Sequence, residues 1–376
     1  MKINKIFLLL LIFPLFFGCL EGSDLSENEN YILNLPPMKD HFNGKFYIGN
    51  IMNPGDAGST ISNKYLTHHF NVLTCENDMK PGYLAPSKGS YNFGTANRMV
   101  DAAIASGMKV VGHTLLWHSQ NAGWMTSSVT ETDMVNYITA VVSNFKGKIY
   151  SWDVLNEVFP DGGFTSDWKT SMRSNNPWFA SSMQSDFVYK GFLAARKADP
   201  NAILYYNDYN TDQVGKATMI RNMVLEVNNK YLASSDKPAG EDLNRLLIEG
   251  IGMQEHHNTG VNANAIRTTL NMFKNMNFTG SNKKIIVSVS ELDVLSQSWN
   301  QYSSSTAITE EGRARQAVLY GEYMKVYLEF SDIIERVSLW GVTDDRSWRA
   351  RGEPLLFSSS GLAKPAYHSF VGALPK

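Results

Sequence analysis

Short β-rich runs alternate with helical patterns from about residue 40 onward in this 376-residue chain, and that alternation limits the possible folds most strongly. Residues 94–106 and 131–146 carry apolar side chains at helical spacing, and Thr130 with Asp133 has the pattern of a capping box. Strands are predicted at 46–51, 70–75, 109–115, 149–154, 202–206, 249–253, 284–289 and 336–339. Eight strands that alternate with helices over this length predict an α/β fold with a parallel sheet, a single (β/α)8 barrel.

Composition favours one domain rather than two. Hydrophobic residues make up 43% of the chain and charged residues 19%, so the chain can bury a large core. No internal repeat and no linker rich in Pro, Gly or Ser interrupts residues 38–376. A division near residue 235 would leave four βα units on each side. We therefore predict a single domain over residues 38–376, of a size usual for a catalytic barrel.

The first 37 residues have the features of a targeting segment. Two lysines precede an apolar run over 6–17, which is too short to span a bilayer. The sequence FFGC that ends at Cys19 resembles the lipobox of bacterial lipoproteins, which implies lipidation of Cys19. A plain secretory signal is the alternative. We predict a lipoprotein signal peptide over 1–18 and a polar tether over 19–37, so that a lipid anchor is the expected contact with the membrane.

Charge and cysteine content argue against several classes of function. The formal net charge of −2 supplies no basic surface of the kind that nucleic-acid binding requires, and no nucleic-acid partner is expected. Two cysteines cannot form a disulfide framework or a four-cysteine zinc site. With Cys19 acylated, Cys75 is expected to be a buried free thiol. We expect a monomer.

Polar clusters follow nearly every predicted strand. In a barrel of parallel strands, the carboxyl ends of all strands meet at one rim. Buried strand ends normally stay apolar, because an unpaired buried charge costs several kcal/mol. The clusters occupy 76–80, 113–118, 156–157, 207–210, 254–257, 291–293 and 340–348. Their recurrence at the same rim predicts an active site.

Two carboxylates stand out among these clusters. Glu157 follows the fourth predicted strand and Glu291 the seventh, so that a closed barrel brings both to one mouth. Paired carboxylates among Trp, Asn, Gln and His describe a glycoside hydrolase site, because one acid protonates the leaving oxygen while the other attacks the anomeric carbon or activates water. A phosphate site would instead require a Gly-rich loop or several arginines.

Seven motifs in the same order resemble those of family 10 of the glycoside hydrolases. They are ENDMKP (76–81), GHTLLWHSQ (112–120), WDVLNEV (152–158), YNDYN (206–210), GIGMQEHH (250–257), SELDV (290–294) and WGVTDDRSWR (340–349). The resemblance covers about residues 40–372. It implies a (β/α)8 barrel that hydrolyses internal β-1,4 bonds of xylan or xylo-oligosaccharides with retention, as an endo-1,4-β-xylanase without a metal or cofactor.

The resemblance also implies roles for individual residues. Glu157 would be the acid/base and Glu291 the nucleophile, which places their carboxyl groups about 5–5.5 Å apart. The residues that would support these two are Asn156, His256, Asp293 and His118. The residues that would bind the sugars are Glu76, Asn77, Lys80, His113, Trp117, Asn207, Tyr209, Gln254, Trp340 and Trp348.

Two places depart from the family pattern. Glu255 stands where Ser or Thr is common, and an extra carboxylate beside Glu291 would raise the pKa of Glu291 unless it points away. Residues 227–246 form a long, charged segment that either shapes product-side subsites or is a solvated surface.

Three other functions stay open at this point. A metal-dependent barrel enzyme would use ligands drawn from His113, His118, His256, His257 and Asp293. A catalytically silent sugar-binding lipoprotein would keep the tryptophans. A β-1,4-glucanase differs least, since one substituent at C5 separates xylose from glucose.

A lipid anchor on a polymer-cutting enzyme suggests the cell envelope, at the outer membrane of a glycan-degrading bacterium.

Overall fold

The computed structural model describes residues 29–58 and 60–374. The predicted signal peptide and Cys19 lie outside the described residues, so lipidation stays a prediction. Within the part of the chain that is described, none of the helices has the length and apolar character needed to cross a membrane.

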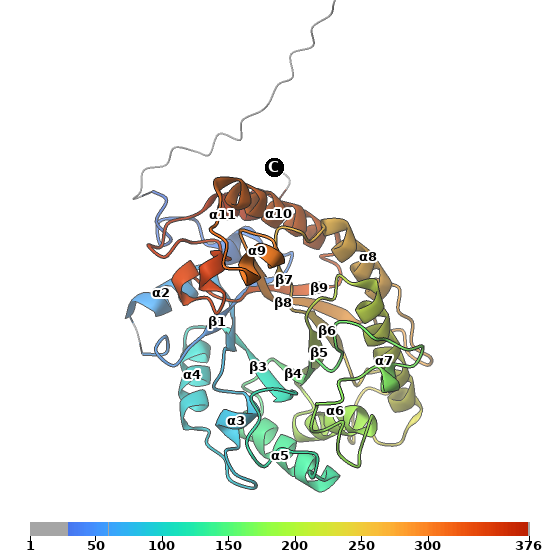
Figure 1. Ribbon diagram of the computed structural model, residues 1–376. Helices are drawn as coiled ribbons and strands as arrows, with labels where there is room; N and C mark the ends of the chain where they lie inside the picture. Colours follow the sequence, from blue (N-terminus) through green and yellow to red (C-terminus); the bar gives the residue numbers. More distant parts are fainter. Residues whose placement is uncertain (1–28, 59, 375–376) are drawn as a thin grey trace, which may run out of the picture.

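Parallel strands close into a barrel at the centre of the described chain (Figure 1). They are β1 (Tyr47–Met52), β2 (Val72–Cys75), β3 (Lys109–Leu116), β4 (Ser151–Asn156), β5 (Ile203–Asp208), β6 (Gly250–Met253), β8 (Ile286–Val294) and β9 (Ile334–Leu339). Each strand pairs with its neighbour in parallel, β6 pairs with β8, and β9 returns to β1. The two-residue strand β7 (His256–His257) adds to the edge of β8 beyond β6. The predicted (β/α)8 barrel is confirmed.

Helices surround the barrel and occupy the segments between strands (Figure 1). They are α1 (Met38–His41), α2 (Thr60–His69), α3 (Pro81–Leu84), α4 (Gly94–Ala105), α5 (Glu131–Asn144), α6 (Asp186–Ala198), α7 (Val214–Ala233), α8 (Ala263–Lys274), α9 (Trp299–Ser303), α10 (Glu310–Glu329) and α11 (Pro365–Val371), with single 3-10 turns η1 (Trp168–Thr170), η2 (Asp344–Arg346) and η3 (Ala350–Gly352). The predicted capping box begins α5, where the Thr130 hydroxyl accepts from the Asp133 amide at 3.2 Å. Both predicted helices, 94–106 and 131–146, form, and they end one or two residues early.

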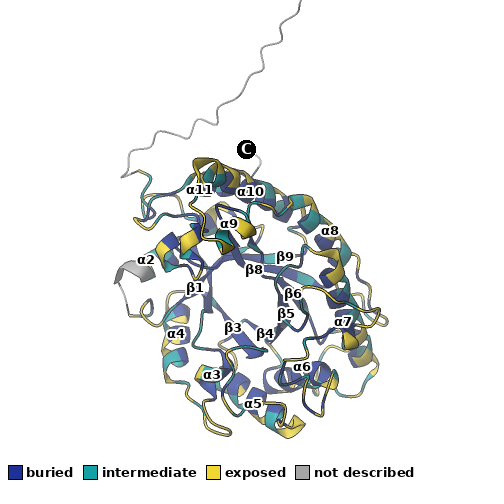
Figure 2. Cartoon of the chain, in the orientation of Figure 1, coloured by how far each residue is buried: buried dark blue, intermediate teal, exposed yellow. Residues whose placement is uncertain are grey.

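The core lies between the barrel and the inner faces of these helices. Strand residues are buried on both sides, whereas the outer faces of the helices are exposed (Figure 2). Helix α5, for example, turns Met134, Ile138 and Val141 inward at a spacing of three to four residues. Cys75 is a buried free thiol, as predicted, and burial raises its pKa to about 12.

The segment 227–246 lies at the closed end of the barrel, away from the carboxyl ends of the strands. Its first part belongs to α7, and the remainder leads into the start of β6. Lys237 donates to the carbonyls of Tyr231 and Leu232 at 2.7 and 3.0 Å and so caps the helix. Segments that connect a helix to the next strand lie opposite the active rim of such a barrel. The interpretation that this segment shapes product-side subsites is therefore wrong.

Candidate active site

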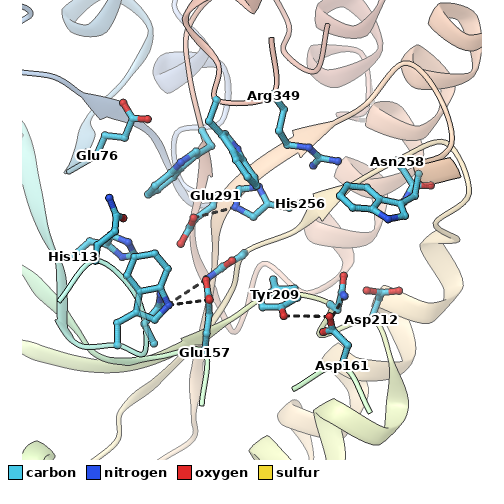
Figure 3. A pocket seen from close by; sticks show the side chains of 18 of the residues that line it. Glu76, His113, Glu157, Asp161, Tyr209, Asp212, His256, Asn258, Glu291 and Arg349 are labelled. Atoms are coloured by element: carbon cyan, nitrogen blue, oxygen red, sulfur yellow. Dashed lines mark hydrogen bonds and ion pairs between the residues drawn. The ribbon is translucent and has the colours of Figure 1, made fainter. Parts of the chain in front are cut away.

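A cleft of about 890 Å³ opens at the carboxyl ends of the strands (Figure 3). Glu157 and Glu291 lie opposite one another at its centre, with Glu76 toward one end and Asp161, Asp212 and Asn258 toward the other. The predicted site residues that line it are Glu76, Asn77, Lys80, His113, Trp117, Asn156, Glu157, Tyr209, Gln254, His256, Glu291, Trp340 and Trp348. The predicted site residues Asn207, His118 and Asp293 are not part of its lining.

Glu157 follows β4 and has a strained backbone. Its φ of 54° lies in the left-handed region, where a non-glycine residue costs about 1–3 kcal/mol. The Glu157 amide donates to the carbonyl of Asn207 at 2.9 Å, which holds this conformation. Trp117 Nε1 donates to one carboxyl oxygen at 2.8 Å, and Gln254 Nε2 donates to the other at 2.9 Å. Both oxygens are therefore oriented by neighbouring side chains.

Arg173, which the sequence analysis missed, secures the backbone of Glu157. Its Nε donates to the carbonyl of Glu157 at 3.0 Å, and a second guanidinium nitrogen donates to the hydroxyl of Tyr209. Arg173 stands 16 residues beyond Glu157 in a polar connection that leads to α6. No local pattern marks it, because its role arises only when that connection folds back over the strand end.

Glu291 lies within β8 and is held by two side chains. Asn207 Nδ2 donates to Oε1 at 2.8 Å, and His256 Nε2 lies 3.1 Å from Oε2. Burial raises the pKa of Glu291, but the hydrogen bond from His256, the nearby His113 and the hydrogen bond from Asn207 together lower it below its usual value. Glu291 is thus ionised at neutral pH.

The predicted substrate contact of Asn207 is wrong, because its side chain is fully buried behind Glu291. Its amide also lies 3.0 Å from the amide of Asn156, and Ser290 donates to its Oδ1 at 2.6 Å. Gly252 on β6 makes room for it, since a Cβ there would lie 2.2 Å from Asn207 Oδ1. Asn207 therefore orients the carboxylate of Glu291 and is not part of the lining of the cleft.

His256 connects Glu291 to a second buried charge pair. Its Nδ1 lies 3.2 Å from Asp293 Oδ2, and Asp293 accepts from Arg349 at 2.6 Å and from Trp348 at 2.9 Å. Burial lowers the pKa of His256, but Asp293 and Glu291 outweigh that effect and raise it to about 9. Below that pH an imidazolium therefore lies between the two carboxylates. The residues predicted from the sequence do not include Arg349, although it stands beside Trp348 at the end of the motif WGVTDDRSWR.

The end of the cleft near Glu76 is lined by neutral donors, a buried lysine and indole rings. Lys80 donates to Asn77 at 2.9 Å, and its ammonium lies 5.2 Å from the centre of the Trp117 ring. Burial lowers the pKa of Lys80, and the nearby carboxylates, Glu291 first, oppose this shift. His113 pairs with Asp153 at 3.0 Å, and its ring meets Trp340 edge to face. Such a surface suits an uncharged polyol.

The opposite end of the cleft extends beyond the residues named from the sequence. Asn258 lies at this end, and the cleft is also lined by Val261 and by Trp299 on α9, which is 55% exposed. Tyr209 donates to Asp161 at 3.2 Å across the floor. A cleft that continues past the carboxylates in both directions can hold a chain on either side of the bond to be cut.

Neither His118 nor Glu255 is part of the lining of the cleft. His118 Nδ1 lies 3.8 Å from Glu157 Oε2, and burial, with the charge of Arg173, lowers its pKa to about 4. The carboxylate of Glu255 points away from Glu291 and accepts from His257 at 2.8 Å and from Tyr327 at 2.9 Å. The expected rise in the pKa of Glu291 therefore does not occur.

The histidines considered as metal ligands are instead paired with separate carboxylates. His113 pairs with Asp153, His256 with Glu291 and Asp293, and His257 with Glu255. Within residues 29–58 and 60–374, no group of three or more His, Cys, Asp or Glu is placed to hold a metal ion. The arrangement does not support the metal-dependent alternative.

Comparisons with known proteins agree on one family. The crystal structure of a bacterial Ig-like domain containing GH10 xylanase from termite gut is 50% identical in sequence. It superimposes with a TM-score of 0.84 and covers 91% of this chain and 78% of that one. The endo-1,4-beta-xylanase of Geobacillus stearothermophilus is 31% identical over 90% of this chain and 98% of its own length.

Other relatives are much longer than this chain. The exoglucanase XynX of Acetivibrio thermocellus is 32% identical over 93% of this chain, which spans only 30% of that protein. The chain likewise spans 29% of the endo-1,4-beta-xylanase A of Thermoanaerobacterium saccharolyticum. The model of glycosyl hydrolase family 10 matches residues 37–373. The chain therefore belongs to glycosyl hydrolase family 10.

Proposed function

We propose that the protein is an endo-1,4-β-xylanase that cuts internal bonds of xylan and xylo-oligosaccharides with retention. The observation that carries the proposal is the pair Glu157 and Glu291, which face one cleft from different hydrogen-bonding environments. Xylanases of similar length among the relatives support the substrate class.

Glu291 acts as the nucleophile in this proposal. It is ionised, and Asn207 and His256 each hold one of its oxygens, so its carboxylate is aimed before substrate arrives. It attacks C1 of the xylose unit and forms a covalent glycosyl-enzyme as the bond to the leaving oxygen breaks.

Glu157 acts as the acid and then as the base. In the first step it gives its proton to the departing oxygen, and in the second it takes a proton from the water that attacks C1 and releases Glu291. Trp117 and Gln254 keep its carboxyl group in place through both steps. Two inversions at C1 give net retention.

The arrangement of the cleft supports cutting inside a chain. Glu76, Asn77 and Lys80 would bind hydroxyls on the non-reducing side, and Trp340 and Trp348 would cover the sugar at the reacting carbon. Trp299 and Asn258 continue the cleft on the reducing side. A cleft that was blocked at one end would instead allow release of sugar units only from the ends of the xylan chain.

Product analysis tests the function directly. The wild type should cut soluble arabinoxylan to short oligosaccharides and act little on carboxymethyl-cellulose. Glu157→Ala should lose about 10²- to 10⁴-fold in kcat on xylan, since general acid–base catalysis contributes that much. On an aryl β-xylobioside, azide should restore turnover of this variant and give the β-glycosyl azide.

Other results would change the assignment. Comparable cutting of cellulose would move the substrate to β-1,4-glucan, a reading that the exoglucanase relative favours, with the mechanism intact. An α-glycosyl azide would overturn the assigned roles. Binding of xylan without turnover by the wild type would indicate a sugar-binding protein.

We further propose that Cys19 carries a lipid and holds the enzyme at the outer membrane, where polysaccharide arrives. The apolar run over 6–17 followed by FFGC supports this proposal. Expressed in a bacterium, the wild type should sediment with membranes and Cys19→Ser should not. Equal membrane association of both chains would contradict lipidation.

A further inference from the structure

Residues 254–257 form a short segment that contacts both catalytic carboxylates. Gln254 donates to Glu157 through its side chain at 2.9 Å, while its carbonyl accepts from the amide of Glu291 at 3.1 Å. Two residues later, His256 contacts the carboxylate of Glu291 at 3.1 Å. A shift in this segment would therefore move the partners of Glu157 and Glu291 together.

Glu255, between these two contacts, has a left-handed backbone and a buried charge. Its φ is 60°, and the residue is 1% exposed. A left-handed glutamate and a buried carboxylate each cost free energy unless neighbours stabilise them. The neighbours here are His257 at 2.8 Å, Tyr327 at 2.9 Å and Thr211 at 3.2 Å, all of which meet the carboxylate.

His257 ties the same turn to the rest of the site. Its carbonyl accepts from Arg349 at 3.1 Å and from the amide of Leu295 at 3.0 Å. Asp212, which lines the cleft, and Asp293 act on its ring as nearby charges. The ring of Tyr323 packs against it, with 5.1 Å between the two ring centres. Burial lowers the pKa of His257, but Glu255 and Asp212 outweigh burial and raise it.

We propose that Glu255 is a positioning residue, whose buried ion pair with His257 fixes the left-handed turn that holds Gln254 on Glu157 and His256 on Glu291. The inference rests on the proposed function, in that the two carboxylates are taken as catalytic. It assigns a role to the residue that departs from the family pattern. Glu255 itself is directed away from the cleft and does not touch substrate.

The substitution Glu255→Gln in the full chain tests the proposal, because it keeps the size of the side chain and removes the charge. We expect kcat on xylo-oligosaccharides to fall on the order of 10- to 100-fold with KM nearly unchanged, since supporting residues act on alignment rather than on binding. The acid limb of kcat/KM should move to higher pH, because a loosened His256 no longer lowers the pKa of Glu291. An unchanged kcat and acid limb, or a loss of stability alone, would overturn the proposal.

Glu335→Gln is the matched control. Glu335 also accepts a tyrosine hydroxyl, from Tyr205 at 2.6 Å, but it lies on β9 toward the closed end of the barrel. This variant should keep kcat and the acid limb of the wild type. If Glu255→Gln yields no folded protein, Tyr327→Phe decides: a smaller fall in kcat at constant KM supports the proposal, and an unchanged kcat overturns it.

Imidazole ¹⁵N NMR separates this inference from the proposed function. If the wild type cuts neither xylan nor an aryl xylobioside, the function fails, yet the turn can still be tested. In the wild type His256 should titrate near pH 9, and in Glu255→Gln its pKa should fall toward the ordinary value as its contacts with Glu291 and Asp293 lengthen. An unchanged titration of His256 would overturn the positioning role whatever the activity.

Discussion

The two ends of the barrel both bury charged networks, yet only one of them forms a site. At the closed end, Arg196 is fully buried and pairs with Glu249 and Glu241 at 2.5 and 3.3 Å. At the open end, His256 and Arg349 flank Asp293. A buried ion pair by itself therefore does not mark an active site in this protein.

The difference between the ends lies in the backbone. Among the described residues, every non-glycine position with positive φ lies after the end of a barrel strand and before the long helix that follows it or, after β9, before α11. These positions are Gln120, Glu157, Gln184, Asn210, Glu255, Ser305 and Glu353. Just before the strands, at the closed end, positive φ is taken by glycines such as Gly107, Gly147 and Gly240. Of these positions, Gln120, Glu157 and Asn210 line the cleft, so part of this backbone strain lies at the site itself.

The largest effect that separates the two ends is expected for Arg196→Met. Removing the arginine leaves Glu241 and Glu249 buried with one cationic partner fewer, which should lower the free energy of unfolding by about 3–5 kcal/mol. Urea unfolding measures this loss. The folded fraction should keep the wild-type kcat, and a matching fall in kcat would show that the two ends are coupled.

The open end should instead show a pH-dependent stability. The pKa of His256 is raised to about 9 in the folded chain, so its stabilisation is complete below the unfolded pKa near 6.5 and is lost as pH rises through 9. The difference amounts to about 3 kcal/mol. Urea unfolding at pH 6 and pH 10 measures it, and His256→Gln should remove most of the dependence. An equal pH dependence in that variant would assign it to other groups.

Asn207→Ala compares buried asparagines at the two ends. Loss of a hydrogen bond to the charged Glu291 should cost about 1.5–3 kcal/mol in the transition state, or roughly 10- to 150-fold in kcat/KM. The acid limb should move to higher pH, since that hydrogen bond lowers the pKa of Glu291. Asn228 is as buried and donates to Ile248 at 2.9 Å at the closed end. Asn228→Ala should lose stability without moving the acid limb.

The smallest effect is expected at the edge of the open end, for Trp299→Ala. A sugar that covers roughly 40 Å² of the indole gains about 1 kcal/mol, so KM for long xylo-oligosaccharides should rise about fivefold. KM for an aryl xylobioside, which occupies the other end, should not change. Tyr83 is 49% exposed but does not line the cleft, and Tyr83→Ala serves as the control. Equal effects on both substrates would place Trp299 outside the binding path.

The barrel and the meeting of Glu157 and Glu291 in one cleft could be predicted from the sequence because their signals are local. Alternating patterns mark the strands and helices, the Thr130 capping box marks the start of α5, and the motifs place Glu157 and Glu291 directly at strand ends. The closed parallel barrel then brings the two to one rim, whatever the loops do.

Only the tertiary structure decided which side chains hold that pair in place. Asn207 contacts Glu291 across 84 positions, Arg349 reaches Asp293 across 56, and Tyr327 reaches Glu255 across 72. The direction of the Glu255 carboxylate likewise depends on a helix far along the chain. Local periodicity determines which helices and strands form and at which of their ends the polar residues lie. Contacts between these helices and strands depend instead on how the barrel closes and how its helices pack.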